Sequence, residues 1–312
     1  TFGAFSPVPK AKDTKQNYDL HPMATGPYKI DSYDRGKQMT LVRNSYWDPK
    51  TDPLRHQFPE TIKVKFGFEQ NALEQQLISD SGDARTGISL DTNVITNIGS
   101  VVGNSKYASR FFGFNSPYAR YLAINMDKVK NSNVRKAIQC AVDLKTVLLA
   151  AGGSAAGVYA NSLIPSNVDP SYRSFDVCGR DVTKKPEAQV AAAKKLLAST
   201  PASQKNIVFA YRDKGVEPQR AAAVQAALQA VGFKVTMQKL PRAGYYTAIG
   251  KRGVPTEPDL IQTSWGFDWP AASGIVYALL DGRTMTKIDS HSNYSRQNVP
   301  GIQALFRAAD RS

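Results

Sequence analysis

Histidine and cysteine are scarce in this sequence, and long apolar runs are absent. The 312 residues include three histidines, His21, His56 and His291, and two cysteines, Cys140 and Cys178. The histidines stand far apart and form no His-x-x-x-His or His-Glu pairing, so exposed or hydrogen-bonded histidines are the simpler interpretation and no metal site is predicted. No run of 18 apolar residues predicts a membrane helix.

Sequence motifs of nucleophilic or nucleotide-dependent catalysis are also missing. Residues 152–157, GGSAAG, would need glycine where Ala156 stands to match a nucleophile elbow. The same glycines follow a predicted helix and lack the Gly-Lys-Ser/Thr ending of a phosphate-binding loop. We therefore predict a protein that is not an enzyme and needs no cofactor. The alternative is a hydrolase whose carboxylates are brought together only by the fold.

Positive charge exceeds negative charge but is dispersed along the chain. Forty lysines and arginines against 26 acidic residues give a net charge of +14. Phosphate binding needs clustered cations, whereas the longest basic runs here are the pairs Lys184-Lys185 and Lys194-Lys195. Nucleic acid is therefore not an expected partner.

The two cysteines leave two interpretations open. Cys140 falls on the apolar side of a predicted helix, which fits a buried free thiol. A disulfide joining it to Cys178 is the other interpretation, and an exported protein would permit it. The sequence does not supply the Cα separation that decides between them.

The first third of the chain predicts a mixed sheet with short helices. Residues 1–22 show no period and indicate an extended lead-in, and because no secretory leader follows Thr1 we expect any export signal to have been removed. Alternating apolar residues at 26–42 predict a hairpin. Residues 62–68 predict another strand, and residues 71–78 a short helix.

The remaining residues predict an α/β arrangement. A helix is expected at 132–151, capped by Asn131 or Ser132 and stopped by glycines at 152–153. A β-α-β unit with parallel strands follows, extended by one more helix and strand, at residues 207–212, 218–231, 233–240, 243–251 and 259–264.

The turn after the last predicted strand is the first place to look for a binding site, because ligands of open α/β sheets bind beyond the carboxyl ends of the strands. Its residues, Trp265-Gly266-Phe267-Asp268-Trp269-Pro270, combine aromatic walls with one carboxylate. The other interpretation is that the aromatic residues of this turn fill the protein core and that Asp268 caps the next helix.

Several segments, taken together and in order, resemble the peptide/nickel/oligopeptide solute-binding proteins, family 5. They are Thr25–Ile30 (TGPYKI), Leu41–Trp47 (LVRNSYW), Tyr121–Asn125 (YLAIN), Asn133–Ile138 (NVRKAI) with Ala141–Asp143 (AVD), Ala193–Leu197 (AKKLL), Gln225–Val235 and Trp265–Pro270. The resemblance implies an α/β, periplasmic-binding-protein-like fold of type II, the two-lobed Venus flytrap. We draw the lobes as residues 1–146 and 147–312.

The resemblance implies the substrate-binding component of an ABC importer, which holds an extended oligopeptide between lobes and delivers it to the permease. By this resemblance Asp268 pairs with the α-ammonium group of the peptide. The ligand-binding residues then include Trp265, Gly266, Phe267 and Trp269 from the same turn, with Tyr121 and Asn125 from an earlier strand. Asn125 has a second interpretation as a turn-stabilising amide. Nickel chelates, haem and oligosaccharides remain alternative solutes.

The resemblance also implies a cellular location and an oligomeric state. We expect an extracytoplasmic monomer, in the periplasm or lipid-anchored, that meets the membrane only through an anchor absent from this chain. The chain departs from the family pattern at Trp269-Pro270-Ala271-Ala272, which lacks the usual acidic residue and spaced proline. Segments that family members carry before residue 25 and after Gln303 are not present. We therefore expect an incomplete fold with exposed sheet edges and weakened ligand affinity.

Overall fold

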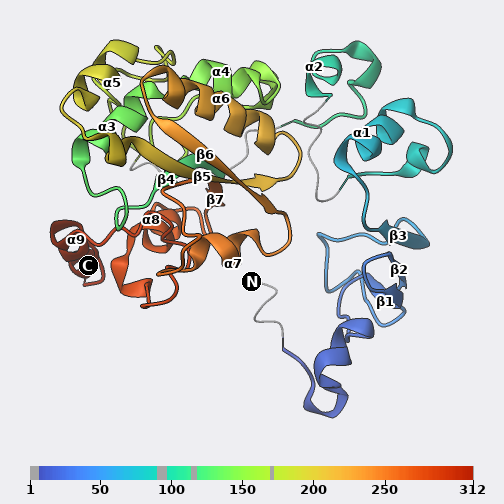
Figure 1. Ribbon diagram of the computed structural model, residues 1–312. Helices are drawn as coiled ribbons and strands as arrows, with labels where there is room; N and C mark the ends of the chain where they lie inside the picture. Colours follow the sequence, from blue (N-terminus) through green and yellow to red (C-terminus); the bar gives the residue numbers. More distant parts are fainter. Residues whose placement is uncertain (1–6, 90–96, 114–117, 169–171, 312) are drawn as a thin grey trace. The chain divides into compact units, whose positions relative to one another are not determined.

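A computed structural model describes residues 7–89, 97–113, 118–168 and 172–311 of the chain (Figure 1). The chain divides into two units, Thr1–Leu90 and Asp91–Ser312. Residues 118–141 supply a strand and a helix to the sheet and core of the second unit. The lobe boundary at residue 146 stays a prediction.

The first unit holds a three-stranded antiparallel sheet. A hairpin joins β1 (Tyr28–Asp34) to β2 (Gln38–Arg43), as predicted, with Gly36 at φ +78° in the turn. β3 (Thr61–Lys65) pairs with β2 and ends before Phe66, earlier than predicted. The sheet is followed by α1 (Gln70–Ser79) and η4 (Gly82–Thr86). The lead-in, predicted to be extended, forms the short helices η2 (Lys10–Lys12) and η3 (Lys15–Leu20), and residues 1–6 lie outside the described residues.

The second unit is α/β. Its strands are β4 (Tyr118–Ile124), β5 (Asn206–Asp213), β6 (Lys234–Pro241) and β7 (Leu260–Gly266). Its longer helices are α3 (Ser132–Ala141), α5 (Val190–Leu197), α6 (Glu217–Ala230), α8 (Ser273–Leu280) and α9 (Pro300–Ala309). Shorter ones are α2 (Ile98–Val101), η5 (Ser105–Tyr107), α4 (Leu144–Leu149), η6 (Gly153–Ala156), η7 (Ala202–Lys205), α7 (Tyr245–Gly250) and η8 (Gly282–Thr284).

The single helix predicted at residues 132–151 is wrong, because the structure has two helices there. α3 ends at Ala141, and Val142 is extended at ψ 120°. Asp143 then begins α4 as its N-cap, accepting a hydrogen bond from the Thr146 backbone N–H at 2.7 Å. Aspartate favours such caps over helix interiors, since its carboxylate satisfies a free N–H of the first turn.

The strand order of the second sheet is β4-β7-β5-β6. The predicted parallel pairing of β5 and β6 is confirmed, β7 also runs parallel to β5, and β4 is antiparallel to β7. From β5 the chain moves outward through α6 to β6, then returns through α7 to β7 on the other side of β5. Right-handed crossovers in opposite directions place their helices on opposite faces. A topological switch point therefore lies between β5 and β7.

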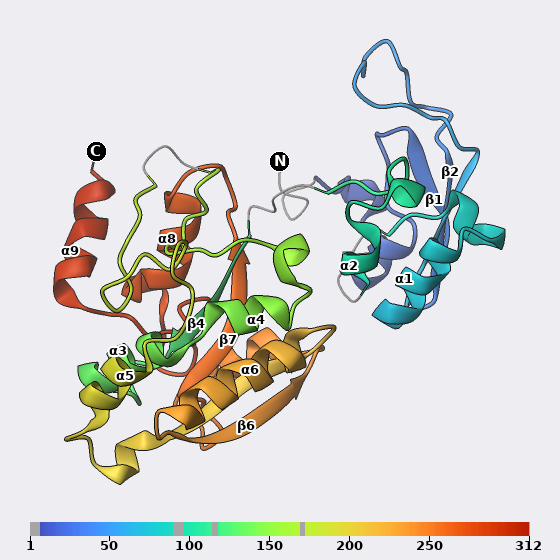
Figure 2. The same cartoon turned by 90° about the horizontal axis from the view of Figure 1, so that it is seen from above.

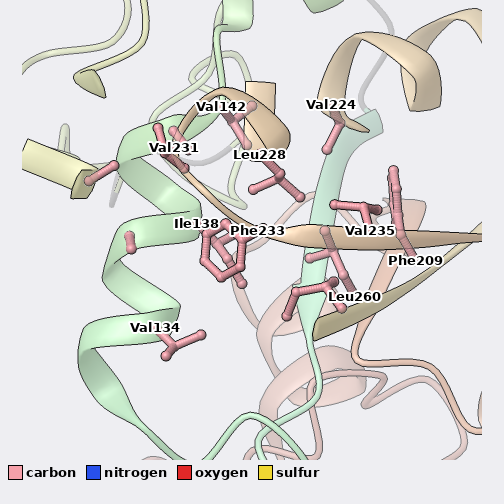
Figure 3. Packing of buried hydrophobic residues seen from close by; sticks show 14 of the residues in the cluster. Val134, Ile138, Val142, Phe209, Val224, Leu228, Val231, Phe233, Val235 and Leu260 are labelled. Carbon is pink, nitrogen blue, oxygen red and sulfur yellow. The ribbon is translucent and has the colours of Figure 1, made fainter. Parts of the chain in front are cut away.

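The two faces of this sheet are covered by different helices. α3, α4, α5 and α6 lie on one face, and α7 and α8 on the other (Figure 1). Seen from above, α6 runs alongside β6 (Figure 2). The larger apolar cluster packs Ile138, Leu228 and Phe209 between α3, α6 and β5 (Figure 3). The smaller cluster, on the opposite face, packs Tyr245 and Ile249 of α7 onto the strands.

Candidate functional site

The turn between β7 and α8 presents the carboxylate singled out from the sequence. Asp268 is exposed, and its side chain has no cationic partner among the residues that the structure describes. The turn is held tightly against α8, because a Cβ atom on Gly274 would come within 2.7 Å of the Trp269 carbonyl oxygen. The Trp269 indole N–H donates to Ser273 Oγ at 2.9 Å. The backbone thus fixes where the free carboxylate stands.

The aromatic residues of the turn differ in their surroundings. Trp269 is 48% exposed, and Phe267 and Trp265 are half-buried. Gly266 provides space for packing, since a Cβ atom there would lie 2.8 Å from the ring of Tyr118 on β4. We therefore assign the absence of a side chain at Gly266 to packing between β4 and β7.

β5 and β7 separate at the switch point. Their parallel ladder consists of the pairs Phe209 with Leu260 and Ala210 with Ile261. Both strands continue beyond these pairs, β5 to Asp213 and β7 to Gly266. The carboxyl ends of two neighbouring parallel strands thus diverge, and this is the place where open α/β sheets bind ligands.

Unpaired polar atoms gather on the α7 face at this end of the sheet. Seven buried side-chain nitrogen or oxygen atoms of the described residues have no hydrogen-bond partner, and five of them belong to this sheet. We name these five the polar row: Tyr121 Oη, Arg212 Nε, Gln238 Oε1, Thr263 Oγ1 and Trp265 Nε1.

Strand register places the polar row on one face. Tyr121 pairs with Thr263, and Ala119 with Trp265, across β4 and β7. Arg212 lies two residues beyond Ala210, so its side chain points to the same face as the small cluster. Gln238 pairs with Ala210 on that face. Buried polar groups are nearly always hydrogen-bonded, so five unpaired ones on one face indicate a site for a polar ligand or ordered water.

Tyrosines surround this end of the sheet. Burial raises the pKa of Tyr121 and of Tyr245 far above the ordinary phenol value. Burial likewise raises the pKa of Tyr294 to about 12. The three hydroxyl groups therefore stay protonated at neutral pH and remain able to donate hydrogen bonds.

Asn125, predicted either as a ligand contact or as a turn amide, lies outside the polar row. Its side chain is 0% exposed. The amide group donates to Glu257 Oε1 and to the Pro258 carbonyl oxygen, each at 3.0 Å, and accepts from the Asp127 backbone N–H at 3.1 Å. Both amide hydrogens are used inside the protein, so this geometry favours the turn-stabilising interpretation.

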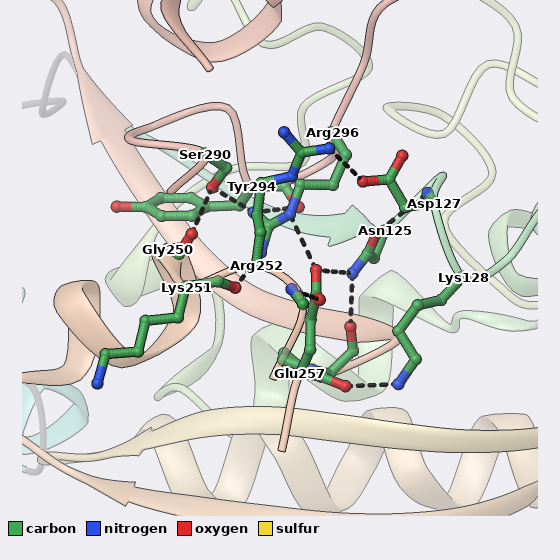
Figure 4. Close-up of polar contacts among 12 residues, drawn as sticks. Asn125, Asp127, Lys128, Gly250, Lys251, Arg252, Glu257, Ser290, Tyr294 and Arg296 are labelled. Carbon is green, nitrogen blue, oxygen red and sulfur yellow. Dashed lines mark hydrogen bonds and ion pairs between the residues drawn. The ribbon is translucent and has the colours of Figure 1, made fainter. Parts of the chain in front are cut away.

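Asn125 belongs to a buried polar network that joins β4 to two later loops (Figure 4). Arg296 is 2% exposed, and its guanidinium group donates to Glu257 Oε1 at 3.3 Å and to the Ile249 carbonyl oxygen at 3.0 Å. It also donates to Ser290 Oγ. Burial lowers the pKa of Arg296, and Glu257 opposes that shift. The network occupies its own donors and acceptors and holds the loop that leads into β7.

Cys140 and Cys178 form a disulfide with a Cα separation of 5.3 Å. The bond joins the buried face of α3 to the loop before α5, which decides between the two interpretations of the sequence. Metal chemistry has no comparable support: the described segments bring no three His, Cys, Asp or Glu side chains together as metal ligands. Within these segments, no helix combines the length and apolar character needed to cross a membrane.

Sequence reasoning missed Arg212, Gln238 and Thr263. The available signal was their position: Thr263 and Trp265 alternate along β7, and Arg212 is near the end of an apolar strand. Alternation alone did not say which face holds the site, because both faces of this sheet are covered.

Comparison with known proteins identifies the family. The model of bacterial extracellular solute-binding proteins, family 5 Middle, matches residues 1–287. The chain belongs to family 5 of the bacterial extracellular solute-binding proteins. This confirms the resemblance drawn from the sequence. No curated protein sequence matches the chain.

Solved structures share the family 5 fold. Clavulanic acid biosynthesis oligopeptide binding protein 2 matches with a TM-score of 0.80 and 24% identity, over 98% of this chain and 56% of that one. The periplasmic binding protein DppA of Helicobacter pylori, in complex with peptide STSA, matches with a TM-score of 0.73 and 15% identity. The match covers 97% of this chain and 55% of that one. NikZ of Campylobacter jejuni, in complex with Ni(L-His), matches with a TM-score of 0.69 and 14% identity. The match covers 98% of this chain and 60% of that one.

These matches confirm the α/β, periplasmic-binding-protein-like fold. The chain spans between 55% and 60% of the length of these three structures. Relative to them the fold is incomplete, as predicted.

Proposed function

We propose that this protein is the substrate-binding component of an ABC importer and that it binds extended oligopeptides between two lobes. The observation that carries the proposal is Asp268, an exposed carboxylate without a cationic partner among the described residues, at the carboxyl end of β7. A free carboxylate beside aromatic side chains suits the ammonium group of a peptide, because charge-assisted hydrogen bonds strengthen where water is sparse.

The diverging ends of β5 and β7 support an extended ligand. Beyond Ala210 and Ile261 the two strands do not pair with each other in the described structure. A peptide main chain bonds to such strand edges without regard to its side chains. In this proposal Asp268 binds the amine, while Trp265, Phe267 and Trp269 contact the ligand and Tyr121 lies among the polar groups beneath. We do not include Asn125.

We infer the remaining properties from family membership. The protein functions as an extracytoplasmic monomer that delivers its solute to a permease, and a lipid anchor or the periplasm keeps it near the membrane. Hinge closure over the solute distinguishes loaded from empty protein for the permease.

Native mass spectrometry of the freshly purified full-length protein tests the ligand class. A ladder of co-purified peptide masses is the expected result. A uniform mass of a metal chelate, haem or oligosaccharide would replace the peptide proposal with one of those solutes. Hydrolysis products from incubated peptides or sugars would instead indicate an enzyme.

Asp268→Asn tests the carboxylate. We expect it to weaken binding of peptides with a free amine by about 1.5–3 kcal/mol, the scale of a hydrogen bond to a charged group. N-acetylated peptides should bind the variant and the parent protein alike in isothermal titration calorimetry. Asp176→Asn, which alters another exposed aspartate of the same unit, is the matched control and should change neither affinity. Equal affinity of the parent protein for free and acetylated peptides would remove Asp268 from this role.

A further inference from the structure

Two stretches of the second unit carry lysines and no acidic residue. Residues 128–142 and 188–212 contain neither aspartate nor glutamate. The first stretch includes α3, and the second includes α5 and most of β5. A surface on which acidic residues alternate with lysines balances its own charge, and these stretches have no such alternation. An exposed lysine here keeps an unbalanced charge unless another part of the chain supplies a carboxylate.

The fold brings the two stretches together. α3 packs against α5, and the two helices lie side by side in Figures 1 and 2. Before the start of α3, Asn131 Nδ2 donates to Gln204 Oε1 at 2.8 Å. Near the end of α3, the Cys140 carbonyl oxygen accepts from the Gln189 backbone N–H at 2.8 Å. The two helices are therefore antiparallel, so that the start of α3 lies beside the end of α5.

Five lysines of these stretches have no carboxylate partner among the residues that the structure describes. Lys128 differs from them, because its Nζ lies 3.2 Å from the Asp259 carboxylate. Four of the five are exposed, and the fifth, Lys205, is half-buried. We name these five the lysine face: Lys130, Lys136, Lys194, Lys195 and Lys205. The fold thus gathers positive charges that the sequence keeps in separate segments.

The arginine of α3 has a structural role beside the lysine face. Arg135 is half-buried, and its Nη1 donates to the carbonyl oxygens of Val129 at 2.8 Å and of Lys130 at 2.7 Å. These bonds hold the turn that leads into α3. The lysine face itself presents ammonium groups, which are point charges on flexible stems without the forked geometry that binds one anion in a fixed direction. Such charges suit an extended anionic surface.

We propose that the lysine face docks the protein onto an anionic phospholipid membrane surface. Lysine stems lie along the protein while their ammonium groups stay in water and approach the lipid phosphates. The chain belongs to a family of extracellular solute-binding proteins, and a bilayer is an extended anionic surface outside the cytoplasm. Each lysine close to such a surface increases the affinity roughly fivefold.

The lysine face and the proposed solute site lie at opposite ends of the second sheet. Lys205 directly precedes β5, whereas Asp268 follows the carboxyl end of β7, which runs parallel to β5. Docking through the lysine face therefore leaves the solute-binding end of this sheet accessible. The proposal goes beyond the proposed function, and membrane docking requires no bound solute.

Cosedimentation with lipid vesicles tests the docking surface. The full chain, produced without any acyl anchor, is mixed with vesicles of phosphatidylcholine or with vesicles of equal parts phosphatidylcholine and phosphatidylglycerol. We expect binding to the anionic vesicles, weakening as sodium chloride is added, and little binding to the neutral ones.

Two double variants locate the surface. Lys194→Gln/Lys195→Gln should weaken binding to the anionic vesicles roughly 10- to 30-fold. Lys251→Gln/Lys287→Gln is the matched control, because it removes two exposed lysines from the loops beyond α7, which lies on the opposite face of the sheet. The control should weaken binding by less than about twofold, since charges farther than about 8 Å from the membrane are screened at physiological salt.

The outcomes decide between a membrane surface and other anions. Equal binding to neutral and anionic vesicles, or equal losses in the two double variants, would refute the proposal. Release by inorganic phosphate, beyond that caused by sodium chloride of the same ionic strength, would indicate a phosphate site instead. Tighter binding to double-stranded DNA than to the anionic vesicles would make the partner a soluble polyanion, and it would also overturn the proposal. None of these measurements involves peptide, so the proposed function can fail or stand independently.

Discussion

The two units of this chain bury their apolar residues to very different extents. In the first unit the buried residues that the structure describes are Asn44 and Glu74, both polar. The residues of its strands β1, β2 and β3 are half-buried or exposed. In the second unit Phe209, Leu228 and Ile261 are 0% exposed. Folding must offset conformational entropy mainly by burying apolar surface. The second unit therefore has a core of its own, and the described part of the first unit does not.

The largest expected effect compares one phenylalanine from each unit. Phe209→Ala removes a side chain from the centre of the larger cluster and should lower the free energy of unfolding by about 3–5 kcal/mol. Phe66 is 39% exposed, so Phe66→Ala should lower the free energy of unfolding by much less. Denaturant unfolding, with hydrogen exchange to follow each unit separately, measures both. Equal losses would contradict the difference between the units.

Reduction of the disulfide should destabilise the second unit alone. The bond closes a loop with a sequence separation of 38, and removing such a bond costs about 2–4 kcal/mol. Cys140→Ser/Cys178→Ser should lower the stability of the second unit by this amount and leave hydrogen exchange in β1–β3 unchanged, because both cysteines lie in the second unit. As a control, a reducing agent should have no further effect on the double variant. Slower or unchanged exchange in α3 would contradict the prediction.

The smallest effect is pH dependence in the second unit. Arg283 donates to both carboxylate oxygens of Asp281 at 2.7–3.0 Å, and these bonds hold the pKa of Asp281 below its ordinary value. A depressed folded-state pKa gives stability that is fully present above about pH 4 and is lost as pH falls through the folded value. Asp281→Asn should cost about 1 kcal/mol or less at pH 7, because Arg283 is solvent-exposed.

The free energy of unfolding, measured between pH 2 and pH 7, checks the predicted loss of stability at low pH. The difference between Asp281→Asn and the parent protein should shrink toward pH 2. Asp176→Asn serves as the control for replacing an exposed carboxylate of the same unit. A difference that stays constant over the whole range would show that the Asp281 carboxylate charge contributes nothing.

Local patterns predicted most of the strands but fewer than half of the helices. The hairpin of β1 and β2, and the β-α-β unit of β5, α6 and β6, follow from alternation, capping residues and turn glycines, all of which act within a few residues. The failure at residues 132–151 is equally local: Asp143 competes for backbone N–H groups and starts a new helix. The turn at Trp265–Pro270 was also found from its place after a strand.

Local sequence patterns did not predict which distant residues particular side chains contact. Asn125 looked equally suited to a ligand or to a turn, and its bonds to Glu257 and Pro258 come from residues more than 130 positions away. The pairing of Cys140 with Cys178 likewise depended on a Cα distance. Arg212 was not singled out from the sequence, because the residues that define its surroundings lie on other elements. Its guanidinium lies over the rings of Tyr245 and Tyr246, and Thr263 on β7 has an unpaired polar atom on the same face.

The sequence by itself determined the family, the hairpin of β1 and β2, the β-α-β unit and the turn that carries Asp268, because these depend on residue types at short spacing. Only the tertiary structure decided that Asn125 is already satisfied, that the cysteines are joined, and that five polar atoms meet without partners on one face of the second sheet. Hydrogen bonds act over about 3 Å, and the chain segments that come within that distance of one another are set by strand order and packing.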